Sequence, residues 1–323
     1  MAQGRINIAM VGNVTEEVAE RLREWNGSSP LVLTTEHEIS AAKLDHIDVL
    51  VFWWPSATLV KLSLEKAKSL KYVHFMNDGL DGIPLELLAQ RNIPVSNGRG
   101  IASCAIAEFA IACVLAHFKR LPNFFRQTQA SIWGLQHCKR IEGKLLAVLG
   151  LGSIGREVAR LGKALGMQVW GVKRTIDAQP IPYVDKVYDN GSLHEVMSHA
   201  DAVIVALPLT KRTYRMIGAT EFSLMKEDSV LVNVSRGAII DEQALCDGLI
   251  LGRPAAAYLD ATEQEPLPAE SRLWSNPNVV ITSHSSWSGE DFIDNCTNNL
   301  IKNLETWLKI GKPCTSVDLT EGY

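Results

Sequence analysis

The chain has 323 residues, 46% of them hydrophobic and 21% charged, and its formal net charge of −4 argues against recruitment of nucleic acid by a global basic field. Its length favours two domains, it contains no apolar run of membrane-spanning length, and no signal-peptide pattern opens it. Because its six cysteines are scattered without a C-x-x-C pair, we expect a protein of the reducing cytoplasm. From the charge and the lack of a spanning run we expect neither a nucleic-acid nor a membrane partner.

The first part of the chain predicts a small unit of alternating strands and helices. Helices are expected after Thr15, at 59–67 and after Pro84. The segment 96–100 (SNGRG) is typical of a hinge, and a long apolar helix is expected to follow it. Apolar runs predict strands at 5–11, 31–34, 49–53, 72–75 and 93–95. The long apolar helix is expected at 105–121. Residues 123–143 show no clear hydrophobic period.

The second part alternates more regularly. Ser192-x-x-Glu195 predicts a capping box, and Thr220 and Asp241 predict helix N-caps. Strands are expected at 145–149, 167–172, 184–188, 202–206, 230–233, 255–259 and 279–282. Apolar strands that alternate with helices predict a parallel sheet covered on both faces. The amphipathic stretch 290–310 predicts a last helix that packs back on the first unit.

A glycine motif ends the first strand of this sheet. The run LLAVLGLGSIG at 145–155 places Gly150, Gly152 and Gly155 between a buried strand and a helix that starts near Ser153 and Ile154. The first glycine allows a tight turn, the second lets backbone approach a pyrophosphate, and the third lets helix pack on strand. The helix N-terminus attracts the phosphates. This context favours a dinucleotide site over a chance glycine turn.

The end of the next strand bears on the choice of dinucleotide. NAD sites place an Asp or Glu there to bind the ribose 2′-hydroxyl. This chain has Lys173 and Arg174 instead, followed by Thr175 as an extra hydroxyl. Two cations attract a 2′-phosphate, so we expect NADP(H) to be preferred, with NAD(H) as the alternative; a solvated Lys-Arg pair would explain the same residues without a cofactor.

Other polar side chains follow strands of the same sheet. Arg236, Asp260 and His284 each come directly after a predicted strand, so we expect them at one edge. The planar guanidinium of Arg236 suits a carboxylate clamp, and a surface arginine at a strand end is an equally good interpretation. Glu265 lies in a loop before Pro266 and is the candidate partner of His284. A histidine–glutamate pair suits proton transfer to a carbonyl group.

Taken together, these motifs resemble the D-isomer-specific 2-hydroxyacid dehydrogenase family over nearly the whole chain. The resemblance is carried by GLGSIG (150–155), ALPLT (206–210), VNVSRGAIIDEQAL (232–245), LDATEQEPLP (259–268) and ITSHSS (281–286). It implies an α/β fold with a doubly wound parallel Rossmann domain at 100–285. That domain would be inserted in a smaller, flavodoxin-like α/β substrate domain formed by 1–99 and 286–323. It also implies a homodimer through the Rossmann domains.

The resemblance also implies roles for single residues. Arg236 would bind the carboxylate and carbonyl of a 2-oxo acid, His284 would be the general acid–base, and Glu265 would tune it. The backbone N–H groups of Asp78 and Gly79 would hold the substrate carboxylate. The family's cofactor contacts fall on Leu207, Pro208, Thr213, Val234, Ser235 and Asp260, the last at the nicotinamide carboxamide.

Several departures refine this expectation. The family usually has proline before the histidine, whereas this chain has Ser283. Glu265 and Ala102 stand where the formate dehydrogenase branch carries Gln and Asn. Lys173 and Arg174 resemble the NADP-using glyoxylate and hydroxypyruvate reductase branch. We therefore expect NADPH-dependent reduction of a 2-oxo acid, glyoxylate, hydroxypyruvate or a bulkier one, to the D-2-hydroxy acid. The alternative is a non-catalytic, dinucleotide-sensing protein of the corepressor type.

Overall fold

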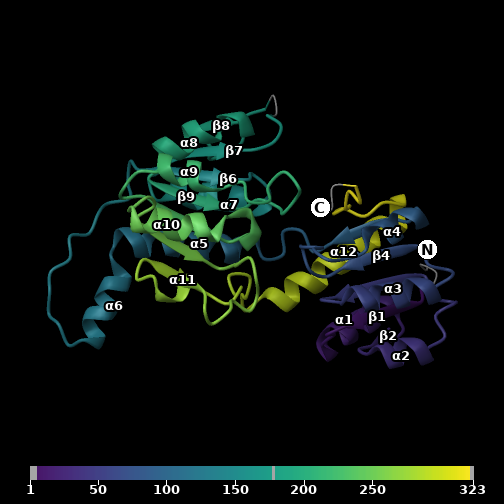
Figure 1. The fold of residues 1–323 in the computed structure, drawn as a ribbon. Coiled ribbons are helices and arrows are strands. Elements are labelled where there is room, and N and C mark those ends of the chain that lie inside the picture. The colour runs from purple at the N-terminus through teal and green to yellow at the C-terminus, as the bar shows by residue number, and fades with distance from the viewer. Residues whose placement is uncertain (1–5, 177–178, 321–323) are drawn as a thin grey trace. The chain divides into compact units, whose positions relative to one another are not determined.

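The computed structural model describes residues 6–176 and 179–320, which separate into two compact units. Unit 1 combines the chain up to Ile101 with the segment from Glu290 onward, and unit 2 runs from Ala102 to Gly289. Each unit is built on one parallel sheet with helices between the strands (Figure 1). The predicted fold class, two α/β units with a Rossmann-like parallel sheet, is confirmed. The functional division into substrate and dinucleotide domains stays a prediction.

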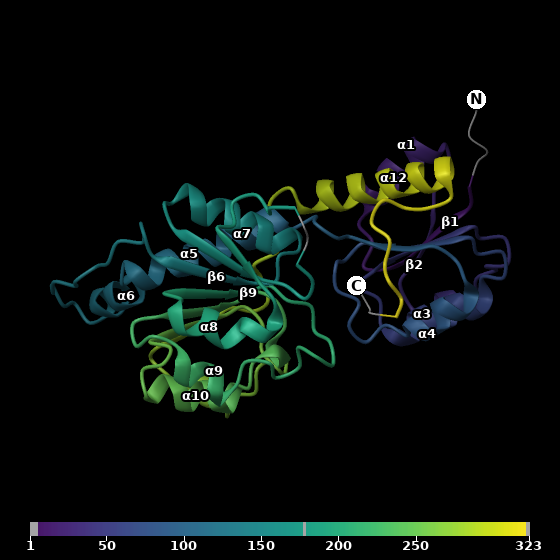
Figure 2. The same ribbon diagram turned by 90° about the horizontal axis from the view of Figure 1, so that it is seen from above.

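The sheet of unit 1 has the strand order β2-β1-β3-β4-β5. Its strands are β1 (Ile8–Gly12), β2 (Leu31–Leu33), β3 (Val49–Trp53), β4 (Tyr72–Phe75) and β5 (Val95–Asn97). Its helices are α1 (Glu16–Asn26), α2 (Glu36–Ala41), α3 (Ala57–Lys66), α4 (Leu85–Arg91) and α12 (Phe292–Ile310). Figure 2 shows α1 and α12 on one face of this sheet and α3 and α4 on the other. The C-terminal helix thus completes unit 1, because α12 contacts α1.

The sheet of unit 2 has seven parallel strands in the order β12-β11-β10-β9-β6-β7-β8. The strands are β6 (Leu145–Leu149), β7 (Gln168–Val172), β8 (Lys186–Tyr188), β9 (Ala202–Val205), β10 (Val230–Asn233), β11 (Ala256–Leu259) and β12 (Val279–Ile281). Strand order reverses between β6 and β9, and such a switch point opens a crevice at the carboxyl ends of the strands. The glycine motif directly follows β6 and therefore lies at this crevice.

Two apolar layers enclose the sheet of unit 2. Its helices are α5 (Ser103–Phe118), α6 (Leu121–Gln129), α7 (Ser153–Ala164), α8 (Leu193–His199), α9 (Ala219–Leu224), α10 (Glu242–Ile250) and α11 (Arg272–Ser275). Figure 2 shows α5 and α7 on one face of the sheet, and α8, α9 and α10 on the other. Alternate residues of β6 enter the two layers: Leu146 and Val148 face α5 and α7, while Ala147 and Leu149 face the opposite helices. This alternation explains why the strand is apolar throughout.

Two of the predicted helix caps, at Ser192 and Thr220, are wrong. Ser192 precedes α8 without capping it, because its hydroxyl donates to Asp189 instead. Helix α9 starts one residue before Thr220, with Gly218 as the N-cap residue. Asp241 does cap α10, since its side chain accepts from the N–H of Ala244 at 3.0 Å.

Two helices escaped the sequence analysis. Helix α2 carries a full capping box, in which the Thr35 side chain and Glu38 bond each other's backbone N–H groups. Helix α6 begins at Leu121 with Pro122 in its first turn, so this proline opens a helix and does not merely follow one. Both α2 and α6 are short.

No helix among residues 6–176 and 179–320 is long and apolar enough to span a bilayer.

Candidate active site

The glycine motif forms a tight turn that leaves room for a ligand at one point. Gly150 has a φ of +99°, and a Cβ there would meet the carbonyl oxygen of Ala206 at 2.4 Å. A Cβ at Gly155 would meet the carbonyl oxygen of Gly150 at 1.8 Å. A Cβ at Gly152, by contrast, would meet nothing within 4 Å. Two glycines therefore allow close packing, while the third faces open space at the helix N-terminus.

That open space fits the phosphates of a dinucleotide. Gly152 is the N-cap residue of α7 and offers no side-chain cap, and the helix begins at Ser153. The first N–H groups of a helix lack intrahelical partners and, with the helix dipole, favour an anion. Gly150, Gly152, Ser153, Ile154 and Gly155 thus fit the role that the sequence assigns to them.

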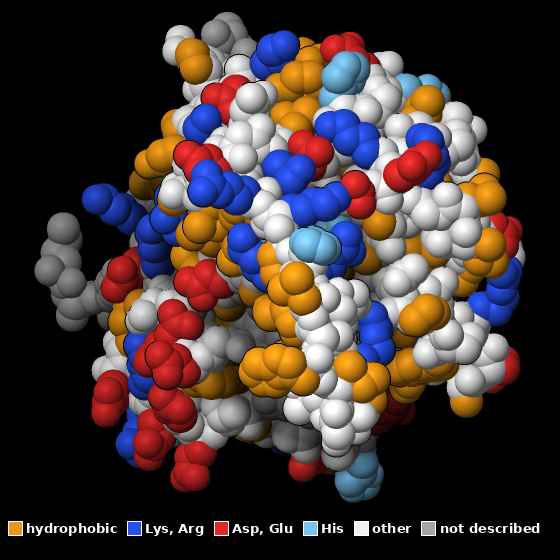
Figure 3. All heavy atoms as spheres, turned by 90° about the vertical axis from the view of Figure 1, so that its left-hand side faces the viewer, with side chains coloured by type: hydrophobic (Ala, Val, Ile, Leu, Met, Phe, Trp, Pro, Cys, Tyr) orange, Lys and Arg blue, Asp and Glu red, His pale blue; other side chains and the backbone are white. Residues whose placement is uncertain are grey.

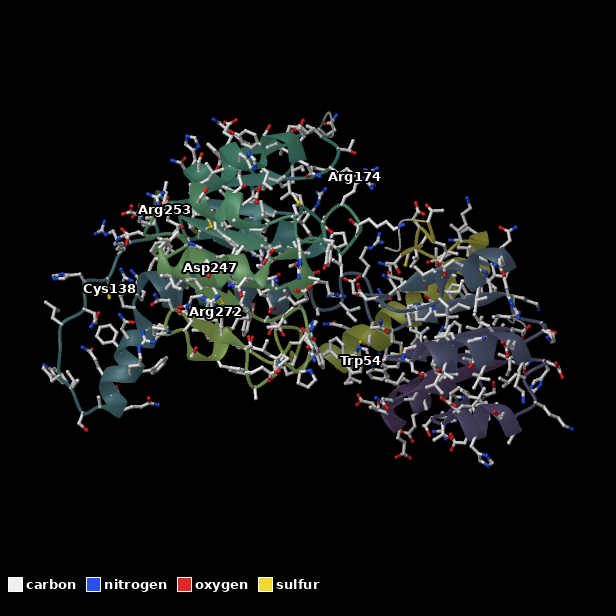
Figure 4. All side chains as sticks on the ribbon, viewed as in Figure 1. Trp54, Cys138, Arg174, Asp247, Arg253 and Arg272 are labelled. Atoms are coloured by element: carbon white, nitrogen blue, oxygen red, sulfur yellow. The ribbon has the colours of Figure 1, made fainter. Side chains whose placement is uncertain are left out.

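Lys173, Arg174 and Thr175 follow β7, the strand next to β6 in the sheet. The backbone N–H of Lys173 donates to the carbonyl oxygen of Tyr188 at 3.0 Å, so β8 fixes the start of this turn. Figure 4 marks Arg174 in the same turn. Arg174 and Thr175 are exposed. All three residues come after the second strand of the sheet, in the position where Rossmann domains recognise the adenosine ribose.

Arg236 belongs to a turn that a buried asparagine organises. The Oδ1 atom of Asn233 accepts from the N–H of Ser235 at 3.1 Å and from its hydroxyl at 2.8 Å. The Nδ2 atom of Asn233 donates to the carbonyl oxygen of Arg236 at 3.0 Å. Nη1 of Arg236 donates to the carbonyl oxygen of Ser235 at 2.9 Å, which orients the guanidinium. Asn233 was missed in the sequence, although an asparagine that ends a strand before Ser-Arg-Gly is a turn signal.

His284 and Glu265 form the predicted pair. The Nδ1 atom of His284 lies 2.9 Å from Oε2 and 3.1 Å from Oε1 of Glu265. Both side chains are partly exposed, at 37% for His284 and 42% for Glu265. The carboxylate accepts at Nδ1, so proton exchange with a substrate falls to Nε2. This geometry matches a general acid–base held in one tautomer.

The loop that carries Glu265 packs directly on the turn that carries Arg236. A Cβ at Gly237 would meet the backbone of Thr262 at 1.9 Å, so only glycine allows this approach. The N–H of Thr262 donates to Oε1 of Glu265 at 3.1 Å. The Thr262 hydroxyl donates to the carbonyl oxygen of Gln264 at 2.8 Å. The structure therefore brings the segments of Arg236, Glu265 and His284 together at one sheet edge.

The remaining predicted cofactor residues stand at the same edge of unit 2. Leu207 and Pro208 come after β9. Val234 and Ser235 follow β10 and are buried. The Thr213 hydroxyl donates to the carbonyl oxygen of Pro208 at 2.7 Å and so closes the loop after β9. Direct contact with a cofactor stays a prediction for these five residues and for Asp260, which directly follows β11 and is 2% exposed.

Asp78 and Gly79 lie in unit 1, in the turn after β4. Nδ2 of Asn97 donates to the carbonyl oxygen of Asp78 at 2.7 Å, and the Asn77 amide donates to that of Gly79. Asn97 thus fixes one carbonyl group from β5, and Asn77 fixes the other from within the turn. The role of the two N–H groups toward a carboxylate stays a prediction.

A separate groove of about 1060 Å³ lies along α9, α10 and α11. Arg215 and Glu263 line it and pair at 3.2 Å, whereas His284 and Arg236 do not line it. Because neither of these two residues lines it, this groove is separate from the candidate catalytic residues. Within residues 6–176 and 179–320, no three His, Cys, Asp or Glu side chains are grouped so that they could hold a metal ion.

Comparison with known proteins decides the family. Residues 111–286 match the model of the D-isomer specific 2-hydroxyacid dehydrogenase NAD binding domain. The chain belongs to the D-isomer specific 2-hydroxyacid dehydrogenase family. It is 35% identical over 232 residues to a glyoxylate reductase of Aeropyrum pernix, and the match covers 69% of each chain.

Two further relatives of the chain differ in length. A D-3-phosphoglycerate dehydrogenase of Methanocaldococcus jannaschii is 32% identical over 87% of this chain, which spans 54% of that protein. The chain thus spans about half the length of that relative. An NADPH-dependent glyoxylate/hydroxypyruvate reductase from Sinorhizobium meliloti, solved with NADP and malonate, superposes with a TM-score of 0.79 at 25% identity. That alignment covers 99% of this chain and 98% of the other.

Proposed function

We propose that the protein is an NADPH-dependent reductase of 2-oxo acids that forms D-2-hydroxy acids. The observation that carries the proposal is the His284–Glu265 pair at 2.9 Å. The loop of Glu265 packs on the turn of Arg236, in the unit whose sheet also carries the glycine motif. Family membership supports the reaction class, and the glyoxylate reductase relatives support a small 2-oxo acid. We infer glyoxylate, hydroxypyruvate or a bulkier 2-oxo acid as substrate.

The chain's own residues divide the work between binding and proton transfer. When bound, the nicotinamide supplies a hydride to the carbonyl carbon of the substrate. His284 delivers a proton from Nε2 to the carbonyl oxygen, which becomes the hydroxyl group. Glu265 holds Nδ1 and keeps the ring oriented. Arg236 binds the substrate carboxylate and stabilises negative charge that develops on the carbonyl oxygen.

The preference for NADP(H) over NAD(H) rests on the turn after β7. Lys173 and Arg174 place two cations where an acid would bind the 2′-hydroxyl of NAD. Solved neighbours that hold NADP or NADPH agree with such a site in this fold. A carboxylate in this position would repel the 2′-phosphate, whereas a cation pair forms charge-assisted hydrogen bonds with it.

We propose further that the protein acts as a homodimer through unit 2. The segment after α5 exposes large apolar side chains, with Phe125 at 66%, Ile132 at 59%, Trp133 at 104% and Leu135 at 84%. Hydrophobic side chains are also plain on the face of the molecule drawn in Figure 3. Contiguous exposed apolar surface is typical of an interface.

We propose the reducing cytoplasm as the location of the protein. Its six cysteines form no disulfide, which suits such a compartment.

A panel assay tests the reductase against the sensor alternative. Purified protein is mixed with NADPH and glyoxylate, hydroxypyruvate or phenylpyruvate, and NADPH oxidation is followed by absorbance. The proposal expects turnover with at least one 2-oxo acid and a D-configured product. Tight NADPH binding without turnover of any of the three acids would instead favour a dinucleotide-sensing protein.

A further inference from the structure

The loop that carries His284 is bonded to a single buried side chain. Asp260 directly follows the neighbouring strand β11 and is 2% exposed. Its Oδ1 atom accepts from the hydroxyl of Thr282 at 2.6 Å and from the N–H of Ser285 at 2.9 Å. Its Oδ2 atom accepts from the N–H of Ser286 at 3.1 Å. The carboxylate therefore binds loop residues on both sides of His284.

The backbone of Asp260 adds a contact at His284 itself. Its carbonyl oxygen accepts from the N–H of His284 at 2.9 Å. Main chain and side chain of one residue thus hold four residues of the loop, because Thr282, His284, Ser285 and Ser286 all donate to it.

This loop needs such support because His284 adopts an unfavourable backbone conformation. Its φ is +52°, in the left-handed region that a residue with a Cβ seldom occupies. Such conformations cost on the order of 1–3 kcal/mol and persist only where the surroundings over-determine them. Ser283 precedes the histidine, so the loop lacks the ring restraint that a proline would give.

We propose that Asp260 is a positioning residue that holds His284 in its proton-transfer geometry. This inference rests on the proposed acid–base role of His284. The carboxylate acts through the loop amides and the Thr282 hydroxyl, and it supplies the restraint that a proline at position 283 would otherwise give. The assignment differs from a contact with the nicotinamide carboxamide, because the bonds that carry it are within the chain.

Asp260→Asn tests the proposal with little change of shape. The amide keeps one accepting oxygen but replaces the other with an NH₂ group, which cannot accept from a loop N–H. We expect kcat to fall at least tenfold while the Kd for NADPH changes less than about twofold. We also expect amide hydrogen exchange in the 282–288 segment to become at least tenfold faster, measured by mass spectrometry.

Two further variants keep the test decisive. Thr282→Val removes a single donor and should change kcat and loop exchange in the same direction by less, even where Asp260→Asn folds poorly. Asp247→Asn is the matched control, because Asp247 lies on α10 and pairs with Arg272 at 3.1 Å, outside the site (Figure 4). This control should leave kcat and the exchange of the 282–288 segment as in the wild type.

The outcomes separate the positioning role from the proposed function. Unchanged loop exchange in Asp260→Asn, or faster exchange with unchanged kcat, would overturn the positioning role. A fall in NADPH affinity with unchanged loop exchange would overturn it in favour of a cofactor contact. Absence of turnover in the wild type would instead refute the proposed function, and the exchange data would still report whether Asp260 holds the loop.

Discussion

At the residue scale, the two cations after β7 are the basis for expecting discrimination between NADPH and NADH. We predict that Lys173→Asp combined with Arg174→Ala shifts the ratio of kcat/KM for NADPH over NADH by at least tenfold toward NADH. A tenfold shift corresponds to about 1.4 kcal/mol of differential binding. The added carboxylate would repel the 2′-phosphate and accept from the ribose hydroxyl of NADH.

The matched control is Lys186→Ala. Lys186 belongs to the neighbouring strand β8 and lies over the Trp170 ring, 4.8 Å from its centroid. Its loss should leave the cofactor ratio unchanged. An unchanged ratio in the double variant would refute the role of the turn after β7, and an equal shift in the control would show that general surface charge sets the preference.

Only some residues of the candidate site can be predicted from the sequence. Arg236, Glu265 and His284 stand after strands or in a Pro-bounded loop, so topology and side-chain chemistry predict them. Asn233 was missed although its hydrogen bonds are local, to residues two and three positions on. The donors to Asp260 were not predicted, because their role depends on hydrogen bonds between segments that are distant in the chain. A serine at position 285 or 286 has no special signal until the loop folds around a carboxylate.

At the element scale, the strand–turn–helix of β6 and α7 separates a packing glycine from a binding glycine. Gly155→Ala should lower the free energy of unfolding by about 1–3 kcal/mol, because its Cβ would overlap the carbonyl oxygen of Gly150. Gly152→Ala should leave the Tm nearly unchanged, since its Cβ meets nothing within 4 Å. It should nevertheless weaken NADPH binding at least tenfold by filling the phosphate space.

Each variant is the control for the other in thermal unfolding and NADPH titration. Equal loss of stability in both would show that the two glycines serve packing alike. Full NADPH affinity in Gly152→Ala would contradict the placement of the phosphates at the N-terminus of α7.

The strand pattern predicted both sheets because β-strands buried on two faces are continuous apolar runs. Helix starts were less predictable, as Thr220 and Ser192 show. A threonine or serine near a helix start competes with neighbouring caps such as Gly218 and Asp189, and only the folded chain decides between them.

Unit 1 contains a buried histidine that makes its stability depend on pH. Burial lowers the pKa of His74 on β4 to about 3, and its Nδ1 lies 2.7 Å from the Ser96 hydroxyl. In the unfolded chain His74 binds a proton below about pH 6.5, whereas in the folded chain the His74 side chain stays neutral until about pH 3. Stability from this histidine is therefore present above pH 6.5 and is lost as the pH falls through this window.

We predict that the unfolding free energy of unit 1 falls between pH 6.5 and pH 4 by up to about 1.4 kcal/mol per pH unit from this group. Denaturant unfolding of the wild type and of His74→Gln at several pH values measures this slope. The variant should be less stable at pH 7 but should show a smaller slope. Equal slopes would mean that folding does not lower the pKa of His74.

At the scale of the whole molecule, we predict a dimer with twice the chain mass of 35.6 kDa in light scattering. Trp133→Ser with Leu135→Ser should shift this equilibrium toward the monomer, because apolar area in the segment after α6 is lost. Ile250→Ser is the matched control, since Ile250 is 71% exposed on α10. A monomeric wild type, or an unaffected dimer in the double variant, would contradict the assignment of this surface.

The central claim is that His284 transfers a proton during reduction of a 2-oxo acid. The most direct measurement is kcat together with the Kd for NADPH in His284→Ala, compared with His194→Ala. His194 forms another histidine–glutamate pair in unit 2, with Nε2 2.8 Å from Glu221, so it controls for the loss of such a pair. We predict that His284→Ala lowers kcat by roughly 10²–10⁴-fold with NADPH affinity retained, and that His194→Ala leaves both unchanged. A kcat near the wild-type value in His284→Ala would contradict the account.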